Sequence, residues 1–479
     1  MAQAQAAPAR ARNLSLATML AFSCTSLPTA ALGVAIAVHL PAFFAAEIGV
    51  PLAVVGSAFA LVRMIDIPIE PGLGLVMDRT RSRFGRYRLW TVLGAPILMA
   101  GLFMLFQAPQ GVDLNYLIAW LLVMYLGLSI LTLSHAAWAA TLATSYDARA
   151  RIFGVMSAVG VLGALMVILI PIGMEQAGYS DAEGVRAMGW FVIALIPIAV
   201  ALVVWRTPEW IAPEAHGQKF RARDYWELIS RPSMARILAA DFCLSLGPGW
   251  MSALYIFFFK DSRGFSTTEA NVLLLVYILA GLAGAPSMGW LATRISKHRA
   301  TMVATTGYSL CLMSIVLLPK GNVLAAIPMM FLAGFLAAGF NVLTRAMTAD
   351  VADEVRLDQG KERSGLLYAL TTLTSKIATA GSIFLTFTVL AQVGYDPKAG
   401  AGNTAEAIHG LELAYLIGPI VFVMLGGACF IGYRLSAARA AEIRRQLEIR
   451  DAAYDEEPII EVVTGEAAIP SPLVEPKSV

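Results

Sequence analysis

The amino-acid sequence predicts an all-α membrane protein with twelve transmembrane helices in two six-helix halves. Of its 479 residues, 58% are hydrophobic and 14% are charged, and the mean hydropathy is +0.69. Soluble domains carry about 25% charged residues. A membrane helix needs about 20 mostly apolar residues, and stretches of this kind recur between residues 15 and 434. These observations exclude a soluble protein and a single membrane anchor.

In the first half, apolar runs and basic loops define six spans. The first span follows Arg10 and Arg12. It is longer than the apolar region of a signal peptide, about 7–15 residues, so we expect it to be retained. The spans are 15–45, 52–77, 90–108, 115–142, 152–175 and 187–206. Basic residues follow every second span: Arg79, Arg81, Arg83, Arg86 and Arg88 after the second, Arg149 and Arg151 after the fourth, and a basic linker after the sixth.

The second half repeats this alternation of basic and poorly basic loops. Its spans are 235–260, 268–292 before Arg294, Lys297 and Arg299, 300–318, 322–349 before Arg356, Lys361 and Arg363, 365–394 and 408–434. The intervening loops hold few Lys or Arg residues. By the positive-inside rule both termini are therefore expected in the cytoplasm, with the chain in a bacterial inner (plasma) membrane.

A polar and basic stretch in the middle of the chain divides the spans into two groups. Residues 225–229 in it are expected to form a short helix, either on the membrane surface or packed as an ordinary linker helix. The expected divisions are an N-terminal half at 1–206, a cytoplasmic linker at 207–233, a C-terminal half at 234–434 and a partly disordered cytoplasmic tail at 435–479.

Two carboxylates lie inside the second span. Asp66 and Glu70 are four residues apart, so they share one face of a helix, with Arg63 one turn earlier. A charge at the bilayer centre costs about 2.5–3.5 kcal/mol, and intramembrane acids usually face a cavity or a partner. The cluster could bind a small cation. The alternative is a static group of ion pairs that joins helices.

Two stretches of the chain carry recognisable motifs. Residues 66–90 read DIPIEPGLGLVMDRTRSRFGRYRLW, and a second stretch holds ADVAD from Ala349, GKERSGLLYA from Gly360, and Lys376. Both resemble the glycoside-pentoside-hexuronide:cation symporters, the melibiose permease group. The resemblance implies the major facilitator fold, with a site between the halves. It also implies a secondary active transporter that carries a sugar or glycoside together with Na⁺ or H⁺ by alternating access.

By position, the resemblance implies that Asp66, Glu70 and Lys376 take part in cation binding and that Ser129 supplies a hydroxyl. The chain departs from the melibiose branch at four positions: Ala30 and Thr132 replace sugar-contacting acids, Ile69 replaces an asparagine, and residues 155–167 hold no counterpart of the fifth-helix arginine. With fewer oxygens for Na⁺, proton coupling stays open. A facilitator for a non-sugar solute, such as a lipid, drug or organic acid, also stays open.

Other polar and aromatic residues of the spans are candidate substrate ligands. His135 could bond a hydroxyl or relay a proton, or it could be a packed group bonded to a neighbouring helix. Aromatic side chains could stack on a sugar, or they could belong to the core or the interface belt. The candidates are Arg63, Thr132, His135, Trp138, Trp250, Asn341 and Tyr368.

Charged residues at the cytoplasmic ends of the second and tenth spans are expected to form a gate. The resemblance to facilitators implies contacts that hold the inward-closed state, although these charges could instead only set the topology. The gate candidates are Asp78, Arg86 and Arg88 in the first half, and Asp350, Asp353 and Arg363 in the second.

The sequence contains no GxSxG, P-loop or HExxH motif, and its four cysteines lie singly in apolar spans. We therefore predict a protein that is not an enzyme, with no metal site and no cofactor other than the coupling ion. The expected partners are a small-molecule substrate and the lipid bilayer, with no nucleic acid, and the chain is expected to be a monomer. An alternative of another class is a non-transporting membrane sensor that signals through residues 437–479.

Overall fold

The computed structural model describes residues 15–80, 82–142, 146–209, 222–317, 319–360 and 363–455. Within these ranges twelve helices are long and apolar enough to cross a membrane, which confirms the twelve predicted spans. The first span, Leu16–Ile48, is broken into α1 (Leu16–Ser23), α2 (Ser26–Val34), the π-helix η1 (Ala35–His39), α3 (Leu40–Phe43) and the π-helix η2 (Phe44–Ile48).

The other spans of the first half are single helices. They are α4 (Leu52–Arg79), α5 (Tyr87–Phe106), α6 (Leu114–Leu142), α7 (Tyr146–Gln176) and α8 (Asp181–Arg206). The second half comprises α10 (Pro232–Phe257) with the π-helix η3 (Phe258–Ser262), α11 (Thr267–Ile295), α12 (Lys297–Leu317), α13 (Val323–Gln359), α14 (Ser364–Gln392) and α15 (Ala405–Ala428), with the 3₁₀-helix η4 (Gly400–Gly402) before α15.

Several span ends differ from the prediction for local reasons. Helix α8 begins at Asp181 rather than 187, because Ser180 and Glu183 form a capping box that satisfies its first donors. Helix α13 continues to Gln359 rather than 349, because its polar continuation remains helical until Gly360 adopts a left-handed conformation at φ 66°. Helix α15 ends at Ala428, and the residues up to 434 form turns.

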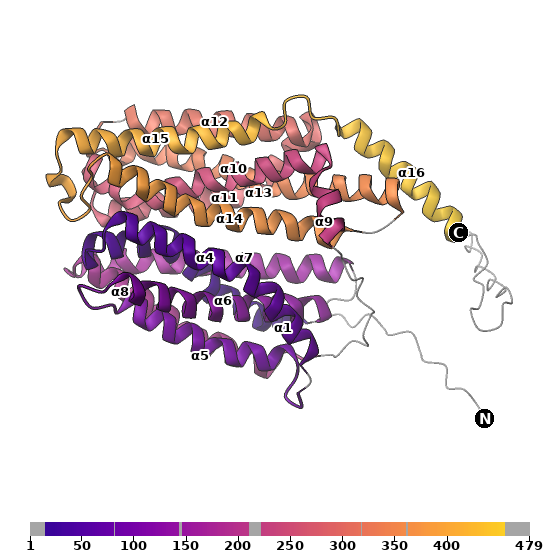
Figure 1. The fold of residues 1–479 in the computed structure, drawn as a ribbon, viewed down its shortest axis with the longest axis horizontal. Helices are drawn as coiled ribbons and strands as arrows, with labels where there is room; N and C mark the ends of the chain where they lie inside the picture. The colour runs from indigo at the N-terminus through magenta and orange to yellow at the C-terminus, as the bar shows by residue number, and fades with distance from the viewer. Residues whose placement is uncertain are drawn as a thin grey trace, which may run out of the picture.

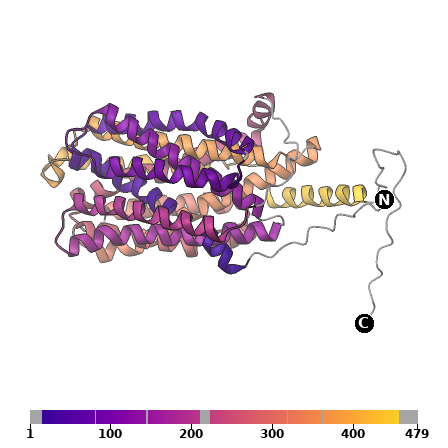
Figure 2. The same cartoon turned by 90° about the horizontal axis from the view of Figure 1, so that it is seen from below.

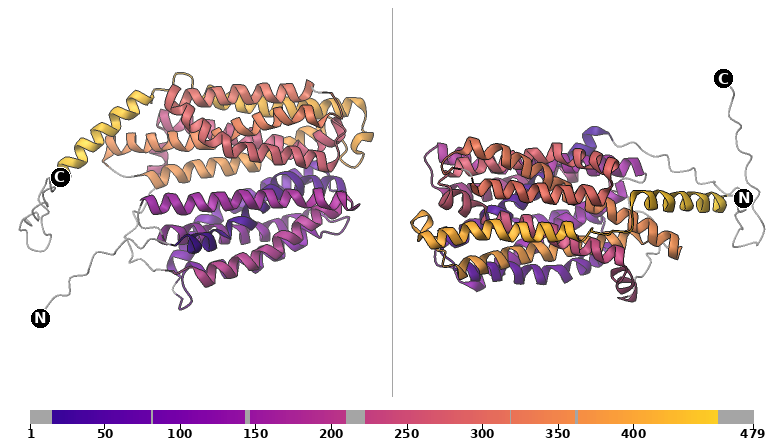
Figure 3. Two further views of the ribbon diagram at one scale, coloured as in Figure 1. Left: turned by 180° about the vertical axis from the view of Figure 1, so that it is seen from behind. Right: turned by 90° about the horizontal axis from the view of Figure 1, so that it is seen from above.

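The spanning helices form two bundles that lie side by side (Figures 1 and 3). One bundle holds α1 to α8, coloured indigo to purple, and the other holds α10 to α15, coloured magenta to yellow. Three contacts join the bundles: α4 packs against α14, α7 packs against α11, and η1 and α3 of the first span pack against α10. The residues of α4 and α14 therefore face each other across the boundary between the bundles.

Glycines allow close approach inside each bundle. A Cβ on Gly101 of α5 would lie 2.6 Å from the backbone of Met124 on α6, and one on Gly127 of α6 would lie 2.4 Å from the backbone of Leu98. In the second bundle Gly334 of α13 meets the backbone of α11 in the same way. Small residues at such crossings are typical of helix packing in membranes.

Two further helices lie at the end of the bundles where α1 begins, and we call this end the α16 end. Helix α9 (Ala222–Ile229) belongs to the predicted linker and includes the expected short helix, with Trp226 72% exposed. Helix α16 (Ala437–Asp455) follows the last span and extends beyond the bundles (Figure 2). The rest of the predicted tail, from residue 456, lies outside the described residues.

Candidate functional site

The two intramembrane acids lie near the middle of α4. Asp66 is 2% exposed, and its Oδ2 accepts a hydrogen bond from Arg63 Nη1 at 3.2 Å, one turn earlier on the same helix. The Arg63 guanidinium also lies over the ring of Tyr125 on α6, 4.2 Å from its centroid. The spacing along α4 therefore places one carboxylate and its cation on a single buried face, held against α6.

Ser129 of α6 contacts both acids. Its Oγ lies 3.0 Å from Asp66 Oδ1 and 3.0 Å from Glu70 Oε1. A serine hydroxyl carries one proton, so it can donate to only one of these oxygens at a time. The second contact between oxygens becomes favourable when a proton or a cation is shared among the three. Carboxylate and hydroxyl oxygens are ligands suited to a small hard cation.

Lys376 completes the cluster from the other bundle. It lies on α14, and its Nζ forms an ion pair with Glu70 Oε2 on α4. The structure thus brings together the four residues that the resemblance assigned to cation binding. Because Lys376 and Glu70 belong to different bundles, the charge state of the acids is tied to the contact between α4 and α14.

Two cavities adjoin this cluster. One, of about 170 Å³, is lined by Arg63 and Lys376 together with Asp241, Asn341 and Arg345, so it lies between α4 and the helices α10, α13 and α14. A second cavity, of about 290 Å³, lies among α10, α11 and α13, and it shares Asp241 and Asn341 with the first. Of the predicted substrate ligands, Arg63 and Asn341 line these cavities.

Sequence reasoning missed Asp241. This acid lies in α10 and is buried, and its Oδ2 accepts a hydrogen bond from Ser375 Oγ at 2.6 Å. The signal that pointed to Asp66 was also present here, because Asp241 is an acid inside a predicted apolar span. It stands without a second acid or a recognisable motif beside it.

His135 and Trp138 are packed residues that line neither of the two cavities. His135 Nε2 lies 2.7 Å from Thr25 Oγ1 and 2.8 Å from the carbonyl oxygen of Phe22, against whose ring it packs. Trp138 is fully buried and donates from Nε1 to the carbonyl of Pro208 at 3.1 Å. The alternative reading of His135 as a packed group describes its geometry.

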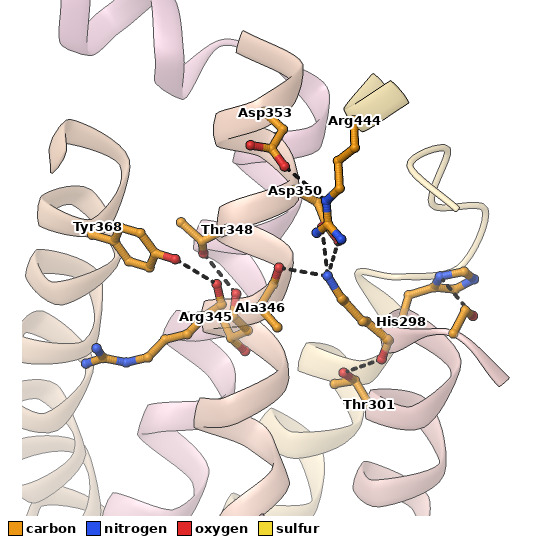
Figure 4. A network of polar contacts seen from close by, with 12 residues as sticks. His298, Thr301, Arg345, Ala346, Thr348, Asp350, Asp353, Tyr368 and Arg444 are labelled. Carbon is orange, nitrogen blue, oxygen red and sulfur yellow. Dashed lines mark hydrogen bonds and ion pairs between the residues drawn. The ribbon is translucent and has the colours of Figure 1, made fainter. Parts of the chain in front are cut away.

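The remaining substrate candidates are not among the residues that line the two cavities. Trp250 is buried between α10 and α15, where its Nε1 donates to the carbonyl of Ala414 at 3.0 Å. Thr132 donates to the carbonyl of Leu128 within α6 at 2.8 Å. Tyr368 donates to the carbonyl of Arg345 at 3.3 Å and so tethers α14 to α13 (Figure 4).

The gate candidates of the second half gather at the α16 end. Asp350 accepts from Lys297 Nζ at 2.6 Å and from Arg444 Nη2 at 2.8 Å, and Asp353 accepts from Arg444 Nε at 3.3 Å (Figure 4). Arg444 belongs to α16. Both acids are thus held by residues of their own half and its tail helix.

Arg363 of the second half and Arg86 and Arg88 of the first half contact the linker. Glu209 accepts from the backbone N–H groups of Arg86 at 2.7 Å and Arg88 at 3.2 Å, which caps the start of α5. Arg363 Nη1 donates to Glu227 of α9 at 3.3 Å. The contacts named here do not join the two bundles. The side chain of Asp78 lies outside the described residues, so its part in a gate stays a prediction.

The bundles are instead joined by polar contacts at the end opposite α16. Asp181 at the start of α8 forms an ion pair with Lys260 of η3 and accepts from Thr267 Oγ1 of α11 at 2.6 Å. Glu175 of α7 accepts from the backbone N–H of Thr268. These contacts close this end of the boundary between the bundles.

The chain is similar to known transport proteins. Residues 21–437 match the family described as MFS/sugar transport protein. An isoprimeverose transporter of Lactiplantibacillus pentosus is 23% identical over 84% of this chain and 85% of its own length. A sodium-dependent lysophosphatidylcholine symporter 1-B of Danio rerio is 24% identical over 82% of each chain.

The fold has solved counterparts. The crystal structure of the nucleoside transporter NupG superposes with a TM-score of 0.67 at 12% identity, covering 88% of this chain and 100% of that one. Together with the family match and the twelve candidate spans, this similarity confirms the predicted major facilitator fold in a multi-pass membrane protein. Since the family match extends over most of its length, the chain belongs to the MFS/sugar transport protein family.

Proposed function

We propose that the protein carries a sugar or glycoside across the membrane together with Na⁺ or H⁺, by alternating access. The observation that carries this proposal is a group of three converging oxygens, from Asp66, Glu70 and Ser129. Of these residues, Glu70 is also paired with Lys376 across the boundary between the bundles. Membership of a sugar transport family and the similarity to an isoprimeverose transporter support a sugar as the solute.

Coupling follows from competition for the acids. A cation held by Asp66, Glu70 and Ser129 offsets the negative charge that now attracts the Lys376 ammonium. Loading the site therefore weakens the ion pair between α4 and α14 and changes the relative stability of states that open on opposite sides. A ligand shifts such an equilibrium only through a difference in its affinity for the two states, and this competition provides one.

The proposed orientation assigns the closed end to the outside. Basic residues concentrate at the α16 end, which by the positive-inside rule faces the cytoplasm. The contacts of Asp181 with Lys260 and Thr267 then hold the outer side shut. In this orientation the structure represents an inward-facing state, in which solute and cation would leave toward the cytoplasm.

Uptake by the purified protein in liposomes tests the coupling. We expect radiolabelled isoprimeverose or lactose to accumulate when an inward Na⁺ or H⁺ gradient is imposed. The double variant Asp66→Asn with Glu70→Gln should abolish this gradient dependence. Glu448→Gln, which replaces an exposed acid of α16, is the matched control and should behave like the natural chain. Gradient-dependent accumulation that survives in the double variant would rule out coupling through these acids.

A further inference from the structure

Asp241 is a buried carboxylate whose hydrogen-bonding capacity is only partly used. It lines both cavities beside the cation cluster, and one of its oxygens accepts from Ser375 at 2.6 Å. Among the described residues no ion pair reaches this carboxylate, whereas Asp66 and Glu70 each have one. A carboxylate offers about four acceptor sites, so Asp241 can take further donors from a bound molecule.

Thr344 gives a second, independent sign of a missing ligand. This residue of α13 is 2% exposed and lines the same two cavities as Asp241. Its hydroxyl is buried and has no hydrogen-bond partner among the described residues. Buried polar groups in native proteins are almost always paired. The hydroxyl therefore points to a polar molecule that occupies this space during function.

Donors for the same molecule come from α13. Asn341 and Arg345 lie four residues apart on this helix, and both line the smaller cavity with exposed side chains. Neither side chain has a hydrogen bond or ion pair among the described residues. In Figure 4 the Arg345 guanidinium extends away from the Asp350 cluster and carries no dashed contact. The cavity thus offers acceptors on Asp241 and unused donors on α13.

The balance of charge favours a neutral ligand. Arg63 and Lys376 also line the smaller cavity, but each is paired with an acid of α4. The charges left over are those of Arg345 and Asp241, which have opposite signs. A charged amine would be attracted by Asp241 and repelled by Arg345. An anion would be attracted by Arg345 and repelled by Asp241. A hydroxyl both donates and accepts, so a ligand with several hydroxyl groups satisfies both side chains.

We propose that Asp241 is the residue that binds the hydroxyl groups of the transported solute, with Asn341 and Arg345 donating to the same molecule and Thr344 completing the contact. The proposal rests on the proposed sugar transport and places the specificity of that site in the second half of the chain. The larger cavity, about 290 Å³, lies just below the range for small-molecule sites, about 300 Å³ and upward.

Binding to the purified full-length protein tests this assignment. Dissociation constants would be measured for isoprimeverose, lactose and singly deoxygenated lactose, with lysophosphatidylcholine as a hydroxyl-poor comparison. Asp241→Asn keeps the shape but removes the charge, and it should weaken sugar binding about tenfold or more, the expected range for a hydrogen bond to a charged group. The deoxy sugar that lacks the Asp241 contact should bind weakly to the natural chain and lose nothing further in the variant.

Controls separate this proposal from the cation mechanism. Stabilisation of the protein by Na⁺ or by acid should be unchanged in Asp241→Asn and lost in Asp66→Asn. Asp113→Asn replaces an exposed acid that caps α6 and should leave sugar binding unchanged. If Asp241→Asn proves too unstable to purify, Thr344→Val takes its place. It preserves the shape of the side chain and should weaken sugar binding severalfold.

Three results would overturn the assignment. These are equal sugar binding by Asp241→Asn and the natural chain, binding of lysophosphatidylcholine without any sugar, and loss of the cation response in Asp241→Asn while sugar binding persists. If the cation has no effect on the natural chain but Asp241→Asn still weakens sugar binding, coupling at Asp66 and Glu70 fails and the present assignment stands.

Discussion

The hydroxyl of Ser129 is the smallest group whose removal tests the cation site. It lies 3.0 Å from an oxygen of Asp66 and 3.0 Å from an oxygen of Glu70. A hydrogen bond to a charged group contributes about 1.5–3 kcal/mol, and about 1.4 kcal/mol corresponds to a tenfold change in an equilibrium constant. Ser129→Ala should therefore change the apparent affinity for the coupling cation by about 10- to 100-fold.

The midpoint that changes identifies the cation. If Na⁺ is coupled, the variant loses an oxygen ligand, so the half-saturating Na⁺ concentration for uptake should rise. If H⁺ is coupled, the variant loses the oxygen that shares the proton with the two acids, so protons bind less tightly. The midpoint of the pH dependence of uptake should then move downward by about one to two pH units.

Liposome uptake across a series of Na⁺ concentrations and pH values measures both outcomes. Ser129→Thr retains the hydroxyl and should keep the natural midpoints. Ser287→Ala removes a half-buried hydroxyl of α11 that bonds only its own helix, and it serves as the control. If Ser129→Ala leaves both midpoints where they are in the natural chain, the three oxygens do not form the cation site.

Other contacts lead to further predictions. Lys376→Gln removes the ammonium that bridges the bundles, so uptake should stop responding to the cation gradient while solute exchange continues; a normal gradient response would contradict the bridging role. Ala46 lines the same cavity as Asp181 and Lys260, so a cysteine introduced there by Ala46→Cys in an otherwise cysteine-free chain reports on access to this end. Asp181→Asn breaks the pair with Lys260 and should speed up alkylation of that cysteine about two- to fivefold, as expected for a partly exposed pair. An unchanged rate would show that the pair does not hold the outer end shut. Arg444→Ala should raise amide exchange in α16 by a similar factor, and unaltered exchange would show that its acid contacts do not anchor this helix.

Hydropathy and charge were sufficient to predict the spans because the bilayer fixes the length of an apolar helix. The same signals do not mark where a helix stops once it leaves the membrane. Helix α13 runs on to Gln359 through polar residues, and its end is set by Gly360. The capping box that starts α8 was visible in the sequence as Ser180 and Glu183, and reading it would have corrected that boundary.

Spacing along a helix predicts which candidate residues share a face. Asp66 and Glu70 share a face because they are four residues apart, and anchoring α6 on its basic loop set the register of Ser129. His135 and Trp138 lie on the same helix but point into a packed cluster with Phe22. Helix α6 is apolar almost all round, so its sequence does not tell which face meets a cavity.

The central claim is tested most directly by using a sugar gradient to drive the cation across the membrane. Liposomes containing the protein and no cation gradient would be given an inward gradient of isoprimeverose or lactose, and entry of radioactive sodium or acidification of the interior would be followed. We predict that the sugar gradient drives the cation inward with the natural chain, and that the Asp66→Asn, Glu70→Gln variant moves sugar without the cation. Sugar flux that carries no cation with the natural chain, or carries it equally with the variant, would contradict the mechanism.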